Sequence, residues 1–193
     1  ANKHNTWEDL IACGESLIAH GTTSKDKLFI LGGSAGGITM GRALTERPDL
    51  FAGVLDLVPA GNTLRAEFSP NGPPNIPEFG TVKTQAGFNN LYEMDTTVHV
   101  KKGVQYPAVM VTTGLNDPRV SSWEPAKVAA ALQASGSIRP VLLRIDAQAG
   151  HGIGSTKTQN DDLYADMIAF VLWRAGESQW RPRLETGAKA ASK

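Results

Sequence analysis

The sequence predicts an α/β fold, with a mostly parallel sheet of about four strands and helices on both faces. Short runs rich in Val, Ile and Leu lack polar alternation, as strands do when both faces of their sheet are covered. Segments with apolar residues three or four positions apart separate these runs and predict helices. Because parallel neighbours need a long connection, this alternation favours right-handed β–α–β crossovers.

The elements follow one another along the chain with clear boundary signals. We expect strands at 27–32, 51–59, 106–114 and 139–147, and helices at 6–20, 35–47, 121–136 and 160–177. Gly21 and Gly136 are typical residues at which a helix ends, and Asn160 or Asp161 is expected to cap the start of the last helix.

Residues 60–103 interrupt this alternation. They contain the Pro- and Gly-dense run SPNGPPNIPEFG, followed by one expected short helix near residues 87–94. Open α/β folds bind ligands at the carboxyl edge of the sheet, so we expect this excursion to lie near that edge. The last residues, 177–193, are expected to form a flexible tail.

Composition narrows the possible partners. The chain has 193 residues, with 19 Lys plus Arg and 19 Asp plus Glu, so no net charge favours nucleic acid or an anionic membrane as a partner. No apolar run approaches the ~20 residues of a membrane span. Cys13, the single cysteine, is expected to be a small buried residue of the first helix. The sequence indicates no compartment.

The stretch KLFILGGSAGGITMGRAL, residues 27–44, carries the clearest functional signal. A flexible linker does not fit, because a strand enters the stretch and a helix leaves it. The G-x-G-x-x-G and G-K-[ST] signatures of nucleotide sites do not occur in it. A strand, a sharp turn with Ser34 at its apex and a helix predict a nucleophile elbow, with Gly32 and Gly36 leaving clearance around a strained serine. A purely structural glycine turn is the alternative.

A serine nucleophile needs a base, and an acid that orients the base. Asp117 follows the strand at 106–114 and His151 lies between glycines after the strand at 139–147, so the chain order is Ser, Asp, His. Asp146 is the main rival acid, for which a hydrogen-bonding role in the loop is expected instead. The remaining candidates are weaker by position: His4, His20, His99, Asp56 and Asp95.

Four motifs in this order, GGSAGG, RPDLFAGVL, YPAVMVTTGLNDPRV and AGHGIGS, resemble the catalytic domain of the prolyl oligopeptidase-family serine peptidases. The resemblance implies an α/β-hydrolase fold with Ser34, Asp117 and His151 as the triad. It also implies that the Ala35 backbone N–H is an oxyanion donor and that Arg119 binds a substrate carbonyl.

Phe79 is the single aromatic residue in the region where eukaryotic members of this family stack a tryptophan on the substrate proline. The resemblance therefore assigns Phe79 to the lining of an apolar substrate pocket and leaves proline specificity open.

The chain also departs from the family. The tyrosine that supplies a second oxyanion donor, the first strands of the sheet and the β-propeller have no counterpart in it. We therefore expect a partial α/β-hydrolase fold over residues 1–176. The strand at 27–32 would have an open edge, which predicts that a second copy of the chain, a missing N-terminal partner or the N-terminal residues folded back cover it.

These features predict a serine hydrolase that cleaves a peptide or a small ester through an acyl-enzyme. A promiscuous small carboxylesterase and a catalytically inert fragment or assembly module stay open as alternatives. No metal and no cofactor are expected, because the sequence has no H-E-x-x-H or paired Cys motif and the chemistry needs neither.

Overall fold

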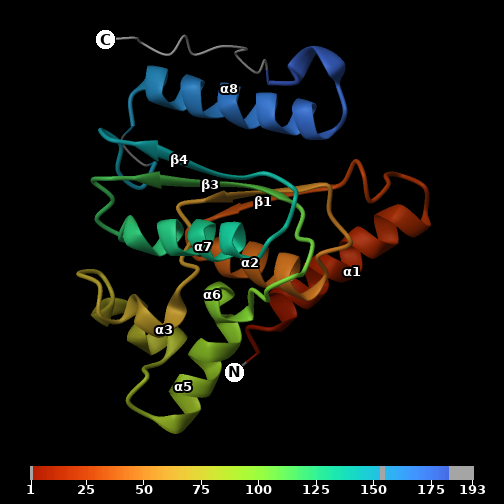
Figure 1. Ribbon diagram of the computed structural model, residues 1–193. Coiled ribbons are helices and arrows are strands. Elements are labelled where there is room, and N and C mark those ends of the chain that lie inside the picture. Colours follow the sequence, from red (N-terminus) through yellow and green to blue (C-terminus); the bar gives the residue numbers. More distant parts are fainter. Residues whose placement is uncertain (1, 153–154, 183–193) are drawn as a thin grey trace, which may run out of the picture.

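A four-stranded sheet forms the middle layer of the computed structural model, which describes residues 2–152 and 155–182 (Figure 1). The strands lie in the order β1-β2-β3-β4, and all neighbours are parallel. This arrangement confirms the predicted α/β class and the parallel sheet of about four strands. The strands are β1 (Phe29–Gly33), β2 (Gly53–Leu57), β3 (Ala108–Gly114) and β4 (Val141–Asp146).

Helices cover both faces of this sheet, as predicted. Each successive strand is added on the same side of the previous one, so right-handed crossovers place their helices on one face. That face carries α1 (Asn5–Ala19), α2 (Gly36–Glu46) and α7 (Trp123–Ala134), whereas α8 (Lys157–Arg174) follows the last strand and covers the other face (Figure 1).

The two faces bury cores of different size. Alternate strand residues point to opposite faces, so Val54 belongs to the larger core under α1, α2 and α7, while Leu55 belongs to the smaller core under α8. Leu31 shares the α8 face with its register neighbour Leu55, yet 55% of Leu31 is exposed. Helix α8 packs on β2 and β3, so it leaves β1 bare on this face.

Residues 60–103 contain more structure than the single short helix that the sequence predicts. That helix is α5 (Gln85–Met94); the other short helices are α3 (Thr63–Ala66), η1 (Pro73–Asn75), α4 (Ile76–Phe79) and α6 (Thr96–His99). Asp95 caps α6, and its Oδ2 accepts hydrogen bonds from Asn62 Nδ2 and Leu64 N. Through this side chain the two ends of the excursion are tied together.

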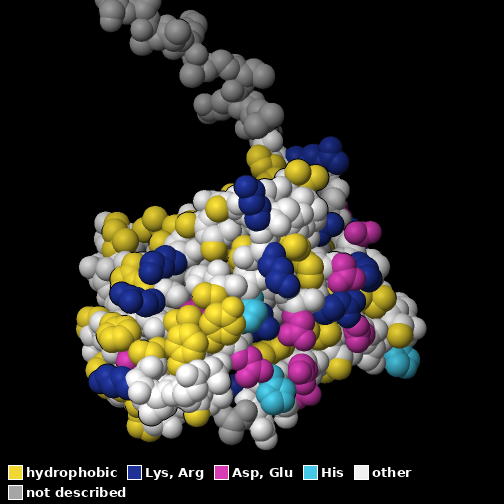
Figure 2. All heavy atoms as spheres, turned by 60° about the horizontal axis from the view of Figure 1, so that its bottom comes forward, with side chains coloured by type: hydrophobic (Ala, Val, Ile, Leu, Met, Phe, Trp, Pro, Cys, Tyr) yellow, Lys and Arg dark blue, Asp and Glu magenta, His cyan; other side chains and the backbone are white. Residues whose placement is uncertain are grey.

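The face of the molecule that includes this excursion mixes apolar, basic and acidic side chains (Figure 2). Phe88, Tyr92 and Val98 are exposed large apolar residues of α5 and α6. Among the described residues, no helix has both the length and the apolar character that crossing a membrane would require.

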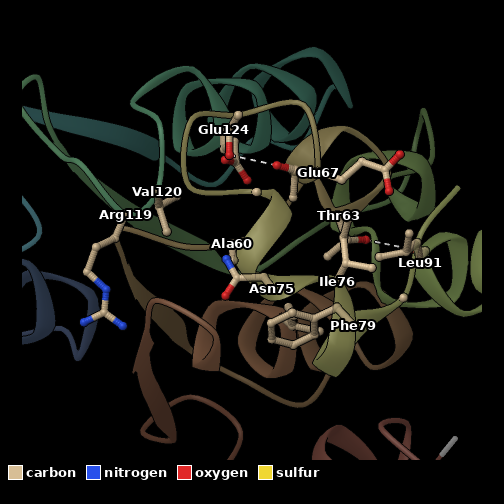
Figure 3. A pocket seen from close by; sticks show the side chains of 15 residues that line it. Ala60, Thr63, Glu67, Asn75, Ile76, Phe79, Leu91, Arg119, Val120 and Glu124 are labelled. Carbon is tan, nitrogen blue, oxygen red and sulfur yellow. Dashed lines mark hydrogen bonds between the residues drawn. The ribbon is translucent and has the colours of Figure 1, made fainter.

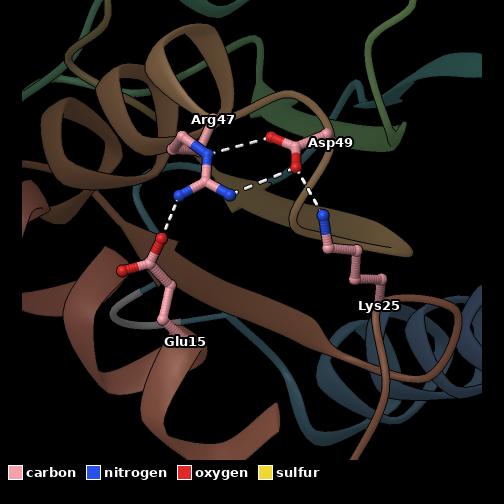
Figure 4. A network of polar contacts seen from close by, with 4 residues as sticks. All are labelled: Glu15, Lys25, Arg47 and Asp49. Atoms are coloured by element: carbon pink, nitrogen blue, oxygen red, sulfur yellow. Dashed lines mark hydrogen bonds and ion pairs between the residues drawn. The ribbon is translucent and has the colours of Figure 1, made fainter. Parts of the chain in front are cut away.

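An ion-pair network joins α1 to the loops around α2 (Figure 4). Arg47 donates from Nε to Asp49 Oδ1 over 2.9 Å and also pairs with Glu15 of α1. Lys25 pairs with Asp49 from the loop before β1. The hydrogen bond from Arg47, followed by that from Lys25, holds the pKa of Asp49 well below its usual range.

Two predicted details are wrong. Cys13 is exposed rather than buried, because the inward face of α1 is made by Trp7, Ile11 and Gly14. Helix α8 begins earlier than expected and is capped by Thr156, whose hydroxyl accepts from the Gln159 N–H while the Gln159 side chain accepts from the Thr156 N–H. This capping box satisfies the first free N–H groups of α8, so Asn160 and Asp161 lie inside the helix.

The expected tail at 177–193 begins with structured residues. A short 3-10 helix spans Ser178–Trp180, and residues 183–193 lie outside the described part of the chain.

Candidate active site

Ser34 stands at the turn between β1 and α2. Its backbone φ is 56°, in the left-handed region that non-glycine residues rarely adopt. Such strain persists only where surrounding structure fixes the backbone, and it is typical of functional positions. The strand, the turn and the helix of the predicted elbow are therefore present, with the serine at the apex.

The segment after β2 braces this turn. The Ser34 N–H donates to Leu57 O, and the Ala60 N–H donates to Ser34 O, each over 2.9 Å. Between them, Val58 has a φ of 43°, which is unusual for a β-branched residue. Pro59 follows and packs against the first turn of α2. Two strained turns thus hold each other in place.

The glycines around Ser34 differ in what they do. A Cβ at Gly37 would lie 2.3 Å from Pro59 Cβ, and a Cβ at Gly32 would lie 2.7 Å from Met40 Cγ. A Cβ at Gly36 would have nothing within 4 Å among the described residues. The predicted clearance is needed at Gly32, but the close approach on the helix side falls at Gly37 rather than at Gly36.

Three loops at the carboxyl edge of the sheet bring Ser34, Asp117 and His151 together. His151 Nε2 lies 2.9 Å from Ser34 Oγ, and His151 Nδ1 lies 2.7 Å from Asp117 Oδ2. The His151 side chain is 6% exposed and that of Asp117 is fully buried. Each residue follows its own strand, and parallel strands end at the same edge, which explains why residues up to 117 positions apart meet here.

Backbone hydrogen bonds fix the Asp117 carboxylate. Its Oδ1 accepts from the Arg119 N–H over 2.8 Å and from the Val120 N–H over 3.0 Å, which leaves Oδ2 for His151. The Asn116 N–H donates to Ala149 O and so joins the Asp117 loop to the His151 loop. A carboxylate held in this way can keep the imidazole in one tautomer and orientation.

Ala35 is the N-cap residue of α2 and is exposed next to Ser34. No backbone carbonyl of the described residues accepts a hydrogen bond from its N–H. A free N–H at the start of a helix favours negative charge. The N–H that the resemblance assigns to the oxyanion donor is therefore without a backbone acceptor at the start of α2.

The rival acids and bases lie elsewhere. Asp146 Oδ1 accepts from the Gln148 and Ala149 N–H groups, and these bonds hold the pKa of Asp146 below its usual value. Asp56 is 1% exposed inside β2, with no hydrogen-bond partner among the described residues, and burial raises its pKa well above the usual range. The other histidines lie at the ends of helices: His4 and His20 flank α1, and His99 closes α6.

A cavity opens beside Ser34. Ala60, Asn75, Phe79, Arg119 and Val120 line its outer part together with Ser34, and the same five residues continue into its inner part. The resemblance points to Phe79 and Arg119 as substrate-binding residues, and both lie on this cavity (Figure 3). Among the described residues, no carboxylate forms an ion pair with the Arg119 guanidinium.

Sequence reasoning missed the inner lining, which includes Thr63, Glu67 and Glu124. Glu124 stands in the first turn of α7, where an acidic residue reads as a solvent-facing partner of the helix dipole. No pattern in the sequence marks it as buried. In the part of the chain that the structure describes, no cluster of three His, Cys, Asp or Glu side chains could hold a metal ion.

Comparison with known proteins agrees with the geometry of the site. A family model described as "Prolyl oligopeptidase family" matches residues 1–178. The prolyl endopeptidase of Elizabethkingia miricola is 36% identical over 182 residues, which cover 90% of this chain and 25% of that protein. Dipeptidyl aminopeptidase BI of Pseudoxanthomonas mexicana is 32% identical over 179 residues, covering 91% of this chain and 25% of that protein.

A solved structure from a study of two prolyl endopeptidases superposes with a TM-score of 0.86 and 33% identity, covering 90% of this chain and 26% of its own. The sheet and helices therefore match the α/β-hydrolase catalytic domain of such enzymes. The chain spans about a quarter of the length of the relatives that it matches.

Proposed function

The chain belongs to the prolyl oligopeptidase family, and on this basis we propose that it carries the catalytic centre of a serine peptidase that works through an acyl-enzyme. The observation that supports this most strongly is the continuous hydrogen-bonded series from Ser34 through His151 to Asp117. Strain at Ser34 and the free N–H of Ala35 supply the other parts that such a centre needs.

The geometry translates into defined steps. His151 Nε2 takes the proton from Ser34 Oγ as the oxygen attacks the substrate carbonyl carbon, and Asp117 stabilises the imidazolium that forms. The Ala35 N–H binds the oxyanion of the tetrahedral intermediate. The intermediate collapses by breaking the C–N bond, and the leaving amine takes its proton from His151. Water then repeats the sequence on the ester to Ser34 and releases the acid.

Two residues on the cavity are proposed to position the substrate. Arg119 Nη groups are free to donate to a substrate carbonyl, because no described carboxylate engages them. Phe79 presents an aromatic ring to the cavity, with Lys3 Nζ 4.8 Å from the ring centroid on another side. Asn71 and Asn75 also line this part of the cavity, so side-chain amides lie beside the ring.

Ester cleavage is the easier reaction for this centre. An alkoxide leaves without first being protonated as an amine must be, and loss of one oxyanion donor costs about 3 kcal/mol of transition-state stabilisation. Because the Ala35 N–H is the one oxyanion donor identified among the described residues, activated esters should be cleaved faster than anilides. Peptide hydrolysis remains the activity that the family supports.

A fluorophosphonate probe tests the proposal without assuming a substrate. Wild-type protein should be labelled at Ser34, and Ser34→Ala should not be labelled. A panel of p-nitrophenyl esters and peptide p-nitroanilides then separates the two reactions. Equal labelling of both proteins, or no labelling of either, contradicts the proposal, and the latter result would favour an inert assembly module.

We also propose that the outer edge of β1 is covered in the working protein. Within the described residues, β1 pairs only with β2, and α1 packs on α2 rather than along this edge. An open edge of this kind presents unpaired N–H and C=O groups. Sedimentation should show a dimer or a complex with another segment of the protein; a stable monomer with rapid amide exchange at β1 contradicts the proposal.

A further inference from the structure

A groove separate from the cavity beside Ser34 lies between α8 and β4, on the face of the sheet that α8 covers. Helix α8 packs on β2 and β3, so β4 is less well covered, and Leu142 is 41% exposed. The groove has a volume of about 430 Å³, within the range of small-molecule sites in proteins, about 300–1,000 Å³. None of the residues that line it lines the cavity beside Ser34.

The walls of this groove are apolar except for one ion pair, between Arg144 and Asp166. Its largest apolar lining residues come from β4, α8 and the segment after α8: Leu142, Phe170, Trp173 and Trp180. Asp166 and Trp173 lie about two turns apart on α8, so the groove follows the helix for ~10 Å. This shape suits an extended apolar chain rather than a compact ligand.

The chain turns back to the groove after α8 ends. Gly176 has a φ of 94°, and the Glu177 N–H donates to Leu172 O, as in the left-handed turns that end many helices. The turn leads into the 3-10 helix Ser178–Trp180 and brings Trp180 to the groove, where 42% of its surface stays exposed. The indole ring therefore offers an apolar contact at the open side of the groove.

Two arginines near one end of the groove have no acidic partner. The Arg174 guanidinium carbon lies 5.2 Å from the centroid of the Trp173 ring, and Arg174 Nε is buried with no hydrogen-bond partner among the described residues. Burial, and then the charge of Arg139, lower the pKa of Arg174 below its usual value. The two guanidinium groups are therefore close enough to repel each other, and no described carboxylate forms an ion pair with either.

The nearby acidic residues do not supply the missing charge. The chain from Asp166 to Pro182 contains two of them, Asp166 and Glu177. Asp166 Oδ2 accepts from Arg144 Nε over 2.7 Å, so its charge is already matched, and Glu177 is exposed and belongs to no ion pair of the described residues. Guanidinium groups held together without a counter-charge favour an anion, and their paired N–H donors fit a carboxylate.

We propose that this groove is a second binding site, which takes an amphiphile with one unbranched acyl chain and a carboxylate head, such as a medium-chain fatty acid. The acyl chain lies along α8 between Leu142, Phe170 and Trp180, and the carboxylate lies beside Arg174 and Arg139. The charge of the head decides the selection, because a neutral head leaves the two arginines unmatched and a cationic head adds a third positive group. The site is independent of the proposed serine peptidase function.

Isothermal titration calorimetry with decanoate, kept below its micelle concentration, tests the site in the full chain. Decanoate should bind at least about tenfold more tightly than decanol, and decyltrimethylammonium more weakly than decanol. Arg174→Gln should lower the affinity for decanoate by about tenfold and change that for decanol by less than about threefold, and Arg139→Gln should act in the same direction to a smaller extent. Arg65→Gln, at an exposed position of α3, is the matched control and should keep both affinities.

A filled groove tests where the ligand binds. Ala169 lines the groove, so Ala169→Phe should lower the affinity for both decanoate and decanol by at least about tenfold. Ala165→Phe, at an exposed position one turn earlier on α8, is the control and should keep the wild-type affinities. Thermal unfolding checks that each variant is folded, and Leu142→Gln provides the same test if Ala169→Phe does not fold.

Equal affinities for decanoate and decanol, or for wild type and Arg174→Gln, overturn the selection of an anionic head. Unchanged binding in Ala169→Phe overturns the location. Decanoate affinity that falls as the protein concentration rises would show that a second copy covers the groove, and binding to anionic vesicles without binding of monomeric decanoate would assign it to a membrane. Either result overturns the proposal, and none of these outcomes depends on whether Ser34 reacts.

Discussion

The loops that follow β3 and β4 begin with the same local structure but lead to different surroundings. Asp117 Oδ1 accepts from the N–H groups two and three residues ahead, and Asp146 Oδ1 does the same in its own loop. The second oxygen of Asp117 meets His151 at 2.7 Å in a buried setting, whereas Asp146 is only partly buried at the rim. The local turn alone therefore does not decide which aspartate can form a hydrogen bond with a histidine.

The difference arises from the order of the strands. β3 lies inside the sheet and ends between the β2 turn and the β4 loop, so the loop that carries His151 folds over Asp117. β4 is the outer strand, so no further strand of the described chain lies beyond Asp146 on that side. Position across the sheet edge, rather than local sequence, separates a proposed catalytic acid from a structural one.

The largest expected effect comes from neutralising the inner aspartate. Asp117→Asn keeps a side chain of the same size but favours the wrong histidine tautomer, so kcat should fall by about 10³- to 10⁴-fold. Asp146→Asn, its matched control, should change kcat by less than about threefold, since surface substitutions usually have small effects. Steady-state hydrolysis of an activated ester measures both, and similar losses in the two variants would contradict the distinction.

A smaller effect should follow from separating the two loops without altering either acid. A Cβ at Gly114 would lie 2.3 Å from Gly150 O and 2.4 Å from Ala149 O, so Gly114→Ala must push the His151 loop away from Asp117. A displacement of about 1 Å can cost about 10²-fold in rate. Gly150→Ala is the control, because its Cβ would meet no described atom closer than 3.4 Å. Equal ester hydrolysis by both variants would show that the contact does not position His151.

Asp56, on the neighbouring strand β2, is an aspartate that has neither backbone N–H donors nor a histidine partner among the described residues. The pKa of Asp56 is raised by burial, so the folded protein keeps the carboxyl protonated while the unfolded chain ionises it above about pH 4. Stability should therefore fall as the pH rises above about 4, and Asp56→Asn should remove that fall.

The gain for Asp56→Asn should be about 1–3 kcal/mol near pH 8 and close to zero near pH 4. Urea unfolding of both proteins at several pH values measures it. A gain that does not grow with pH would mean that Asp56 has a partner in solution.

The smallest effect is expected at the exposed carboxylate of Figure 4. The pKa of Asp49 is lowered in the folded state, so its contribution is present above about pH 4 and is lost as the pH falls towards the folded pKa. Because the side chain is half exposed, Asp49→Asn should lower the free energy of unfolding by only about 0.5 kcal/mol at neutral pH. Salt at about 0.5 M should close the gap, and a loss that is independent of salt would contradict an ionic origin.

The sequence predicts the strands and the long helices because burial on both faces leaves continuous apolar runs in this chain. The sequence-based predictions are wrong where tertiary contacts with other segments decide which residues are buried. Cys13 lies one position away from the inward face of α1, and the short helices of residues 60–103 owe their positions to Asp95 and its partners rather than to a periodic pattern. The Thr156–Gln159 capping box was readable as a T-x-x-Q signal before an apolar run.

The residues of the site also divide into those that the sequence predicts and those that it does not. Ser34, Asp117 and His151 could be selected from strand ends and chain order, since parallel strands deliver such residues to one edge. Glu124 could not be selected in this way, because its burial depends on the packing of residues 60–103 against α7. A glutamate in the first turn of a helix gives no sequence signal for such a contact.

The second-order rate of fluorophosphonate labelling at Ser34 tests the central claim most directly, because it reports activation of the serine without any choice of substrate. It is measured for wild type, Asp117→Asn and Asp146→Asn, with the labelled residue identified by peptide mapping. We expect a rate at least about 100-fold lower in Asp117→Asn and within about threefold of wild type in Asp146→Asn. Wild-type rates in both variants, or a label on another residue, would contradict the central claim.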